Sequence, residues 1–149
     1  MTVLDTNFLI DLLNDEPGIS IVADSFHNPK TTIINVFELY YGASCSSKPE
    51  ENIFKINILL KSLGILEFDR DAALKSGGIQ AKLMNSGRPV DPMDVLIAGI
   101  VLSNDEELVT RNIDHFKRIP GLRYRSWQIG DYGEIGRSKE HCAIRKKME

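Results

Sequence analysis

Short apolar or β-branched runs alternate with segments of helical periodicity along the first 127 residues of the chain. A run of a few such residues indicates a buried strand, whereas apolar residues that recur every three or four positions indicate one face of a helix. Strands that alternate with helices predict an α/β fold, a three-layer α/β/α sandwich with a central parallel sheet. The predicted strands are residues 3–4, 31–34, 65–68, 107–110 and 122–127, the last of them an edge strand.

Boundary residues mark several of the predicted helices. Asp91 is a typical N-cap and Pro92 suits the first helical position. The helix that follows them is apolar on nearly every side, so we expect it to be buried. The other predicted helices are residues 8–13, a segment from Asn35 to Ser44, residues 51–63 with Gly64 as the cap, residues 70–85, and one turn near Phe116.

The composition is that of one globular domain. Of 149 residues, 42% are apolar and 26% are charged, which excludes disordered, collagen-like and disulfide-dense small proteins. The formal net charge of −3 disfavours a protein that coats DNA by bulk positive charge. We assign residues 1–127 to the domain and residues 128–149 to a polar C-terminal extension, either flexible or containing one short helix.

The sequence favours a soluble protein of the cytoplasm, with no membrane contact. Cys45 and Cys142 are the only cysteines and have no metal-ligand spacing, so we expect neither a disulfide scaffold nor a zinc site. The first residues lack a basic segment and carry Asp5 and Asp11, which is unlike a signal peptide. The longest apolar run, residues 95–102, is far shorter than the roughly 20 residues of a membrane span.

Three acidic residues lie where a parallel sheet places its ligand site. Asp5 ends the first predicted strand, while Glu38 and Asp94 each lie in the first turn of a predicted helix. The carboxyl ends of parallel strands and the N-termini of the following helices meet at one edge of the sheet. The sequence therefore predicts that these three carboxylates gather at that edge.

Helix capping is the alternative role for these acids. Glu38 and Asp94 each lie three residues after a capping residue, which is the spacing of a capping box. Capping explains Asp5 less well, because Thr6 and Asn7 directly after it are themselves good caps. Both roles stay open for Glu38 and Asp94 at this stage.

Carboxylates that lie close together repel one another unless a cation separates them. Mg²⁺ and Mn²⁺ prefer oxygen ligands, keep several waters and bind phosphate. A site of this kind activates water for attack on a phosphodiester. The three acids therefore predict a Mg²⁺ or Mn²⁺ site that acts on phosphate esters.

Four segments, in this order, resemble the PIN-domain family, and within it the toxins of the VapC type. They are VLDTNFLIDLL, NVFELYYG, PVDPMDVLIAGIVL and ELVTRNIDHFKRIPGLR, and the resemblance covers residues 2 to about 127. It implies a PIN-like fold and a metal-dependent endoribonuclease that hydrolyses RNA with a metal-activated water. It also implies the toxin half of a type II toxin–antitoxin pair, a homodimer that a small cognate antitoxin holds inactive.

The resemblance assigns roles to individual residues. Asp5, Glu38 and Asp94 match the metal-binding acids of the family. Asn112, in the TRN sequence, matches a fourth polar position, but relatives with TRN often carry an acid directly before the Phe, where this chain has His115. The fourth ligand is therefore either Asn112 or Asp114. The candidates for positioning a water or a ligand, with helix capping as their alternative role, are Thr6, Asn7 and Thr110.

A group of basic residues near the end of the domain is the candidate RNA contact, with an ordinary solvated surface as the alternative. The group contains Arg111, Lys117 and Arg118, with Arg123 and Arg125 further along. His27, His115 and His141 have no metal or catalytic-triad spacing, so we expect surface or structural roles for them. An exposed apolar face on the helices of residues 35–63 is the feature expected of a homodimer.

Two other functions remain in competition. A PIN-like module with a degenerate site would bind RNA or protein without cleaving RNA, and Asn112 in place of an acid favours it. Another Mg²⁺-dependent phosphoesterase would use the same acids on a different substrate.

Overall fold

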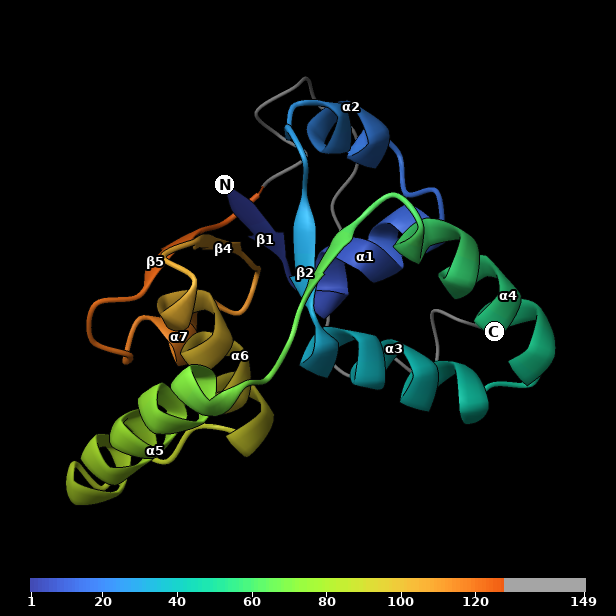
Figure 1. Cartoon of the computed structure of the whole chain (residues 1–149). Coiled ribbons are helices and arrows are strands. Elements are labelled where there is room, and N and C mark those ends of the chain that lie inside the picture. Colours follow the sequence, from blue (N-terminus) through green and yellow to red (C-terminus); the bar gives the residue numbers. More distant parts are fainter. Residues whose placement is uncertain (128–149) are drawn as a thin grey trace.

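The computed structural model describes residues 1–127 as strands and helices in alternation. Figure 1 shows their arrangement, with helices on both sides of a central sheet. In chain order the elements are β1 (Thr2–Leu4), α1 (Thr6–Leu13), α2 (Ile19–Asp24), β2 (Lys30–Thr32), α3 (Ile33–Ser44), α4 (Pro49–Leu60), β3 (Gly64–Leu66), α5 (Arg70–Asn85), α6 (Pro92–Ser103), β4 (Glu107–Val109), α7 (Ile113–Phe116) and β5 (Arg123–Arg125).

The sheet is parallel throughout and has the strand order β3-β2-β1-β4-β5. β1 is central, with Val3 opposite Lys30 of β2 on one side and opposite Leu108 of β4 on the other. The chain therefore adds β2 and β3 on one side of β1, and later adds β4 and β5 on its other side. Ligands of such sheets bind beyond the carboxyl ends of the strands at this change of direction, here between β1 and β4.

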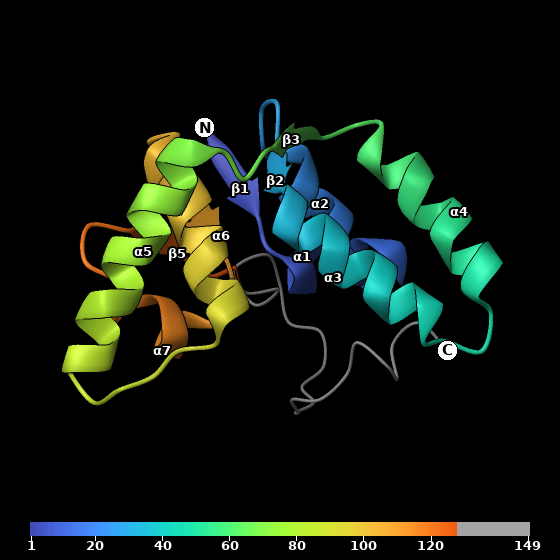
Figure 2. The same ribbon diagram turned by 60° about the horizontal axis from the view of Figure 1, so that its bottom comes forward.

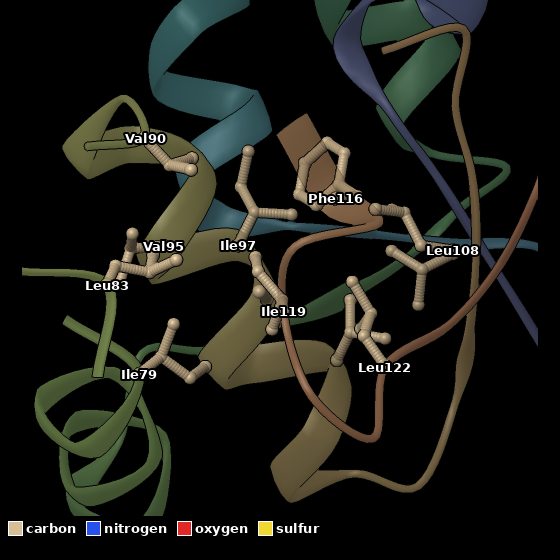
Figure 3. Close-up of a cluster of buried hydrophobic side chains, with 12 residues drawn as sticks. Ile79, Leu83, Val90, Val95, Ile97, Leu108, Phe116, Ile119 and Leu122 are labelled. Carbon is tan, nitrogen blue, oxygen red and sulfur yellow. The ribbon is translucent and has the colours of Figure 1, made fainter. Parts of the chain in front are cut away.

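Alternating residues of β1 and β4 divide the core between the two faces of the sheet. Val3 and Leu108 are fully buried in the cluster under α5, α6 and α7. Figure 3 shows Leu108 in this cluster with Phe116 and other apolar side chains. Leu4 and Val109, 1% exposed, belong to the second cluster, which α1 to α4 cover. Helices on both faces, visible in Figures 1 and 2, confirm the predicted α/β/α sandwich.

Three local features differ from the sequence-based expectations. α2 was not predicted, because only Ile19 and Val22 of this short helix are buried, too few to give a periodic signal. α3 begins at Ile33 rather than Asn35, since Thr32 is its N-cap. Gly64 is the first residue of β3 and not a helix cap.

Two further expectations concern the limits of the domain. The predicted C-terminal extension, residues 128–149, lies outside the described residues. Within the part of the chain that is described, no helix combines the length and the apolar character needed to cross a membrane.

α5 and α6 pack closely at Gly99, whose place in α6 leaves no room for a side chain. A Cβ there would lie 1.9 Å from the Ser76 Oγ and 2.8 Å from the Ala72 carbonyl oxygen of α5. The Ser76 hydroxyl in turn donates a hydrogen bond to the Val95 carbonyl, 3.3 Å away. The contact holds α6, and Asp94 with it, against the outer helix.

Gly99→Ala is predicted to lower the free energy of unfolding by about 1–3 kcal/mol, because the added methyl group forces the two helices apart. Gly77→Ala in α5 is the matched control, since no heavy atom lies within 4 Å of its Cβ position. It should raise stability by up to about 1 kcal/mol through helix propensity. Urea unfolding followed by circular dichroism measures both, and a neutral Gly99→Ala would contradict the packing described.

Candidate active site

Asp5 lies at the carboxyl end of β1 and is held by groups from three strand ends. Its Oδ1 accepts hydrogen bonds from the Thr6 backbone N–H (2.8 Å) and the Asn35 Nδ2 (2.9 Å). Its Oδ2 accepts a hydrogen bond from the hydroxyl of Thr110, which follows β4. Asp5 is also the N-cap of α1, so the expectation that Thr6 or Asn7 caps this helix is wrong.

Burial raises the pKa of Asp5, although the hydrogen bonds from Thr110, Thr6 and Asn35 act in the opposite direction. Its side chain is surrounded by protein, with 6% of the residue exposed. A buried carboxylate with three donors around it is fixed in place. Asp5 therefore provides a rigidly held carboxyl group at the change of direction in the sheet.

Asn35 is a central member of the site that the sequence analysis did not select. It is fully buried, and its Nδ2 donates to both the Asp5 Oδ1 and the Thr6 Oγ1, each at 2.9 Å. Its Oδ1 accepts from the backbone N–H and the hydroxyl of Thr32, which closes a capping box between residues 32 and 35. The sequence does contain a sign of this role, because Thr32 lies three residues before Asn35, which is the spacing of a capping box at the start of a helix.

Glu38 reaches the same site from the second turn of α3. Its Oε1 accepts a hydrogen bond from the Thr6 hydroxyl at 2.8 Å. The alternative role left open for Glu38, a capping box with Asn35, is wrong because Asn35 forms the capping box with Thr32. The pKa of Glu38 is raised to about 7, first by burial and then by the negative charges of Asp5 and Asp94, while the hydrogen bond from Thr6 acts in the opposite direction. Glu38 therefore lies close enough to the other two acids for their negative charges to affect its pKa.

Asp94 approaches from the first turn of α6. Asp91 is the N-cap of this helix, as predicted, and accepts from the Met93 N–H at 2.8 Å. The Asp94 Oδ2 lies 2.7 Å from the His115 Nδ1 and accepts from the Asn112 Nδ2 at 3.3 Å. Burial raises the pKa of Asp94, the His115 hydrogen bond opposes this effect, and the charge of Asp5 adds to it.

Asn112 joins the group, whereas Asp114 does not. Asn112 is the N-cap residue of α7, but its side chain caps nothing and contacts Asp94 and His115 instead. Asp114 carries an exposed side chain that pairs with Lys117 at 2.5 Å. Asn7 is exposed on the surface of α1. Sequence reasoning had assigned His115 a surface or structural role, and the structure places its ring beside Asp94.

The three candidate RNA contacts occupy different settings. The Arg111 guanidinium pairs with the Asp11 Oδ2 at 2.9 Å and stacks 4.4 Å from the centre of the Trp127 ring. Asp11 is 2% exposed, so Arg111 compensates a buried charge. Lys117 and Arg118 are exposed at the end of α7, Lys117 in its pair with Asp114.

The donor set fits a hard divalent cation in its chemistry. Three carboxylates have raised pKa values through burial, and Asp5 raises the pKa of both Glu38 and Asp94. In residues 1–127, no three Asp, Glu, His or Cys side chains are already placed to hold one ion. Thr6 and Asn35 link Asp5 to Glu38 through hydrogen bonds. A cation would offset the repulsion and the burial of these carboxylates.

Comparisons with known proteins agree with this site. The family model described as PIN domain matches residues 2–122. The chain is 35% identical over 127 residues to the tRNA(fMet)-specific endonuclease VapC of Salmonella typhimurium, which covers 84% of this chain and 96% of that protein. It is 34% identical over 135 residues to Ribonuclease VapC2 of Rickettsia felis, with the same coverage.

Solved structures give the same result for the fold. VapBC from Salmonella typhimurium, bound to DNA, matches with a TM-score of 0.79 and 34% identity over 85% of this chain and 98% of that chain. VapBC2 from Rickettsia felis matches with a TM-score of 0.76 and 31% identity, over 85% of this chain and 98% of that chain. The chain therefore belongs to the PIN-domain family, among its VapC ribonucleases.

Proposed function

We propose that this chain is the toxin of a type II toxin–antitoxin system, an endoribonuclease that depends on a divalent cation. The observation that carries the proposal is the meeting of Asp5, Glu38 and Asp94 at the change of direction in the sheet, with raised pKa values. Acidic groups in such a place are typical of a metal-assisted hydrolase. Similarity to proteins named VapC ribonucleases supports RNA as the substrate.

The cation is Mg²⁺ or Mn²⁺, bound by Asp5, Glu38 and Asp94. When bound, such a cation lowers the pKa of water and neutralises charge on the phosphate. Thr6 and Thr110 donate hydrogen bonds to Glu38 and Asp5 and hold these carboxylates in place.

Asn112 is the better candidate than Asp114 for the fourth polar position. The Asn112 side chain contacts Asp94, while that of Asp114 is exposed and paired with Lys117. An amide oxygen still binds a hard cation, although it carries no charge.

Cleavage of RNA also requires contacts to its phosphates. Lys117 and Arg118 are exposed at the end of α7, which places two cations one turn beyond His115. They would position the backbone of the RNA without reading its sequence. Arg111, already engaged by Asp11 and Trp127, acts by holding the segment that carries Asn112. Two similar proteins are named tRNA(fMet)-specific endonucleases, so tRNA(fMet) is the first substrate to test.

The partners are a cognate antitoxin and a second copy of the chain. Similar solved structures are VapBC toxin–antitoxin complexes, which supports the antitoxin.

α3 exposes Phe37 and Tyr41, stacked with ring centres 6.3 Å apart, and α4 exposes Phe54 and Ile58. Exposed apolar side chains on neighbouring helices are the feature expected of a homodimer. Cytoplasm is the proposed compartment, where Cys45 stays a free, exposed thiol.

A degenerate module that binds without cleaving is the second candidate function. Asn112 in place of an acid is the observation that favours it. Such a module has no need to keep three carboxylates together at the cost of their burial, which favours the nuclease. Activity on another phosphate ester would leave the similarity to ribonucleases unexplained.

Asp5→Asn, Glu38→Gln and Asp94→Asn are each predicted to lower RNA cleavage at least about 100-fold, because each removes an anionic ligand. The assay follows end-labelled tRNA(fMet) and total RNA with Mg²⁺, Mn²⁺ or EDTA, and EDTA should abolish cleavage by the unmodified protein. Asp91→Asn is the matched control, since asparagine also caps helices. Normal cleavage by Asp5→Asn or cleavage in EDTA would contradict the proposal, and metal binding without cleavage would favour the degenerate module.

Metal-free protein is predicted to lose stability as the pH rises from about 4.5 to 7. Glu38 has a pKa of about 7 when folded and 4.5 as its ordinary value, so in this window the folded state holds a proton that the unfolded state has released. Stability then falls with pH and stays low above pH 7. Glu38→Gln has no such proton and should be more stable by up to about 3 kcal/mol at pH 8.

Thermal unfolding in EDTA at pH 5 and pH 8 measures this effect. The difference between the two proteins should be small at pH 5 and large at pH 8. Mn²⁺ should restore the stability of the unmodified protein at pH 8 and leave Glu38→Gln nearly unchanged. A difference in stability between the unmodified protein and Glu38→Gln that is the same at both pH values would show that Glu38 ionises in the folded state as it does in water.

Dimerisation is predicted to depend on the exposed side chains of α3 and α4. Tyr41→Glu and Phe54→Glu should each give a monomer, because a carboxylate cannot be buried unpaired at an interface. Leu74→Glu on α5, where Leu74 is 76% exposed, is the matched control and should leave a dimer. Size-exclusion chromatography with light scattering measures the mass, and a monomeric unmodified protein would exclude the homodimer.

A further inference from the structure

His115 lies against the proposed metal site, although no step described above uses it. Its ring belongs to α7, and 44% of its side chain is exposed. Its Nδ1 lies 2.7 Å from the Asp94 Oδ2 and 2.7 Å from the Asn112 Nδ2, while these last two atoms are 3.3 Å apart. Three polar atoms from α6 and the start of α7 thus form a small triangle.

While Asp94 is ionised, as it would be when it binds a cation, no arrangement of protons satisfies all three sides of this triangle. If the His115 Nδ1 carries a proton, it donates to Asp94 but faces the N–H of Asn112. If it carries none, it accepts from Asn112 but turns a lone pair toward the Asp94 carboxylate. Turning the Asn112 amide over places its oxygen against that same carboxylate. With Asp94 ionised, one side of the triangle is unfavourable in each of these arrangements.

A divalent cation held by the three side chains would remove this conflict. Neighbouring ligand atoms in an octahedron of radius 2.1–2.2 Å lie about 3.0 Å apart. The three observed separations, 2.7, 2.7 and 3.3 Å, lie on either side of that value. The Asn112 amide would present its oxygen, an orientation that its side chain reaches by a simple turn. The His115 Nε2 would keep its proton and donate it to water on the exposed side.

We propose that Asp94, Asn112 and His115 form one face of the divalent-cation site, and that the His115 nitrogen shifts its preference from Mg²⁺ toward Mn²⁺. The proposal rests on the proposed function, because it concerns the same site. Mg²⁺ takes oxygen ligands almost exclusively, whereas transition metals accept imidazole readily. A nitrogen ligand therefore favours Mn²⁺ beyond the preference that the carboxylates alone would give.

Binding of Mn²⁺ and Mg²⁺ to the full-length protein, measured by calorimetry, tests the proposal without reference to activity. His115→Asp exchanges the nitrogen ligand for an oxygen ligand, and His115→Ala removes it. The ratio of Mn²⁺ to Mg²⁺ affinity should fall at least about tenfold in His115→Asp, and Mn²⁺ affinity should fall by a similar factor in His115→Ala. His27→Asp is the matched control, because His27 is exposed before β2, away from the site, and its ratio should not change.

Pulsed electron paramagnetic resonance of bound Mn²⁺ provides a second readout. Coupling to a nitrogen nucleus should be present in the unmodified protein and in His27→Asp, and absent in His115→Asp. Unchanged Mn²⁺ affinity in His115→Ala together with no nitrogen coupling would overturn the inference, while metal-dependent RNA cleavage would still stand. Absence of any Mn²⁺ or Mg²⁺ binding would overturn both the inference and the proposed function.

Discussion

The buried carboxylate of Asp5 is the point on which the site depends. It receives hydrogen bonds from Thr6, Asn35 and Thr110, which follow β1, β2 and β4 respectively. Three neighbouring strand ends are thereby tied to one anion, and each of them leads into a helix or loop that carries another site residue. Loss of this carboxylate would leave three donors without a partner in the interior, where an unmade hydrogen bond is costly.

The fold followed from the sequence more completely than the site did. Central strands and the buried helix α6 have strong signals, because burial on both sides makes their residues apolar without interruption. At the start of α3 the same capping spacing occurs twice, as Thr32 with Asn35 and as Asn35 with Glu38. The structure forms the first of these, with Thr32 as the N-cap. His115 could not be selected because α7 is a four-residue helix whose placement depends on tertiary contacts.

The position of the acids shows a conflict between stability and function. Burial raises the pKa of Asp5, Glu38 and Asp94, so the ionised form of each side chain is less stable here than it would be in water. The chain tolerates them because the two apolar clusters on either side of the sheet supply the stability that the site removes. Hydroxyl and amide donors, rather than basic side chains, hold Asp5 and Glu38, so their negative charge stays available to a cation.

The segment of residues 110–112 has each of its side chains fixed to a different part of the protein. Thr110 bonds to Asp5, Arg111 to Asp11 and Trp127, and Asn112 to Asp94. In a population of cells selected for survival of this toxin, escape mutations would therefore gather at Arg111 and Asp11 as well as at the acids. Mutations at Arg111 or Asp11 would act by releasing the segment that carries Asn112, rather than by removing one of the three acids.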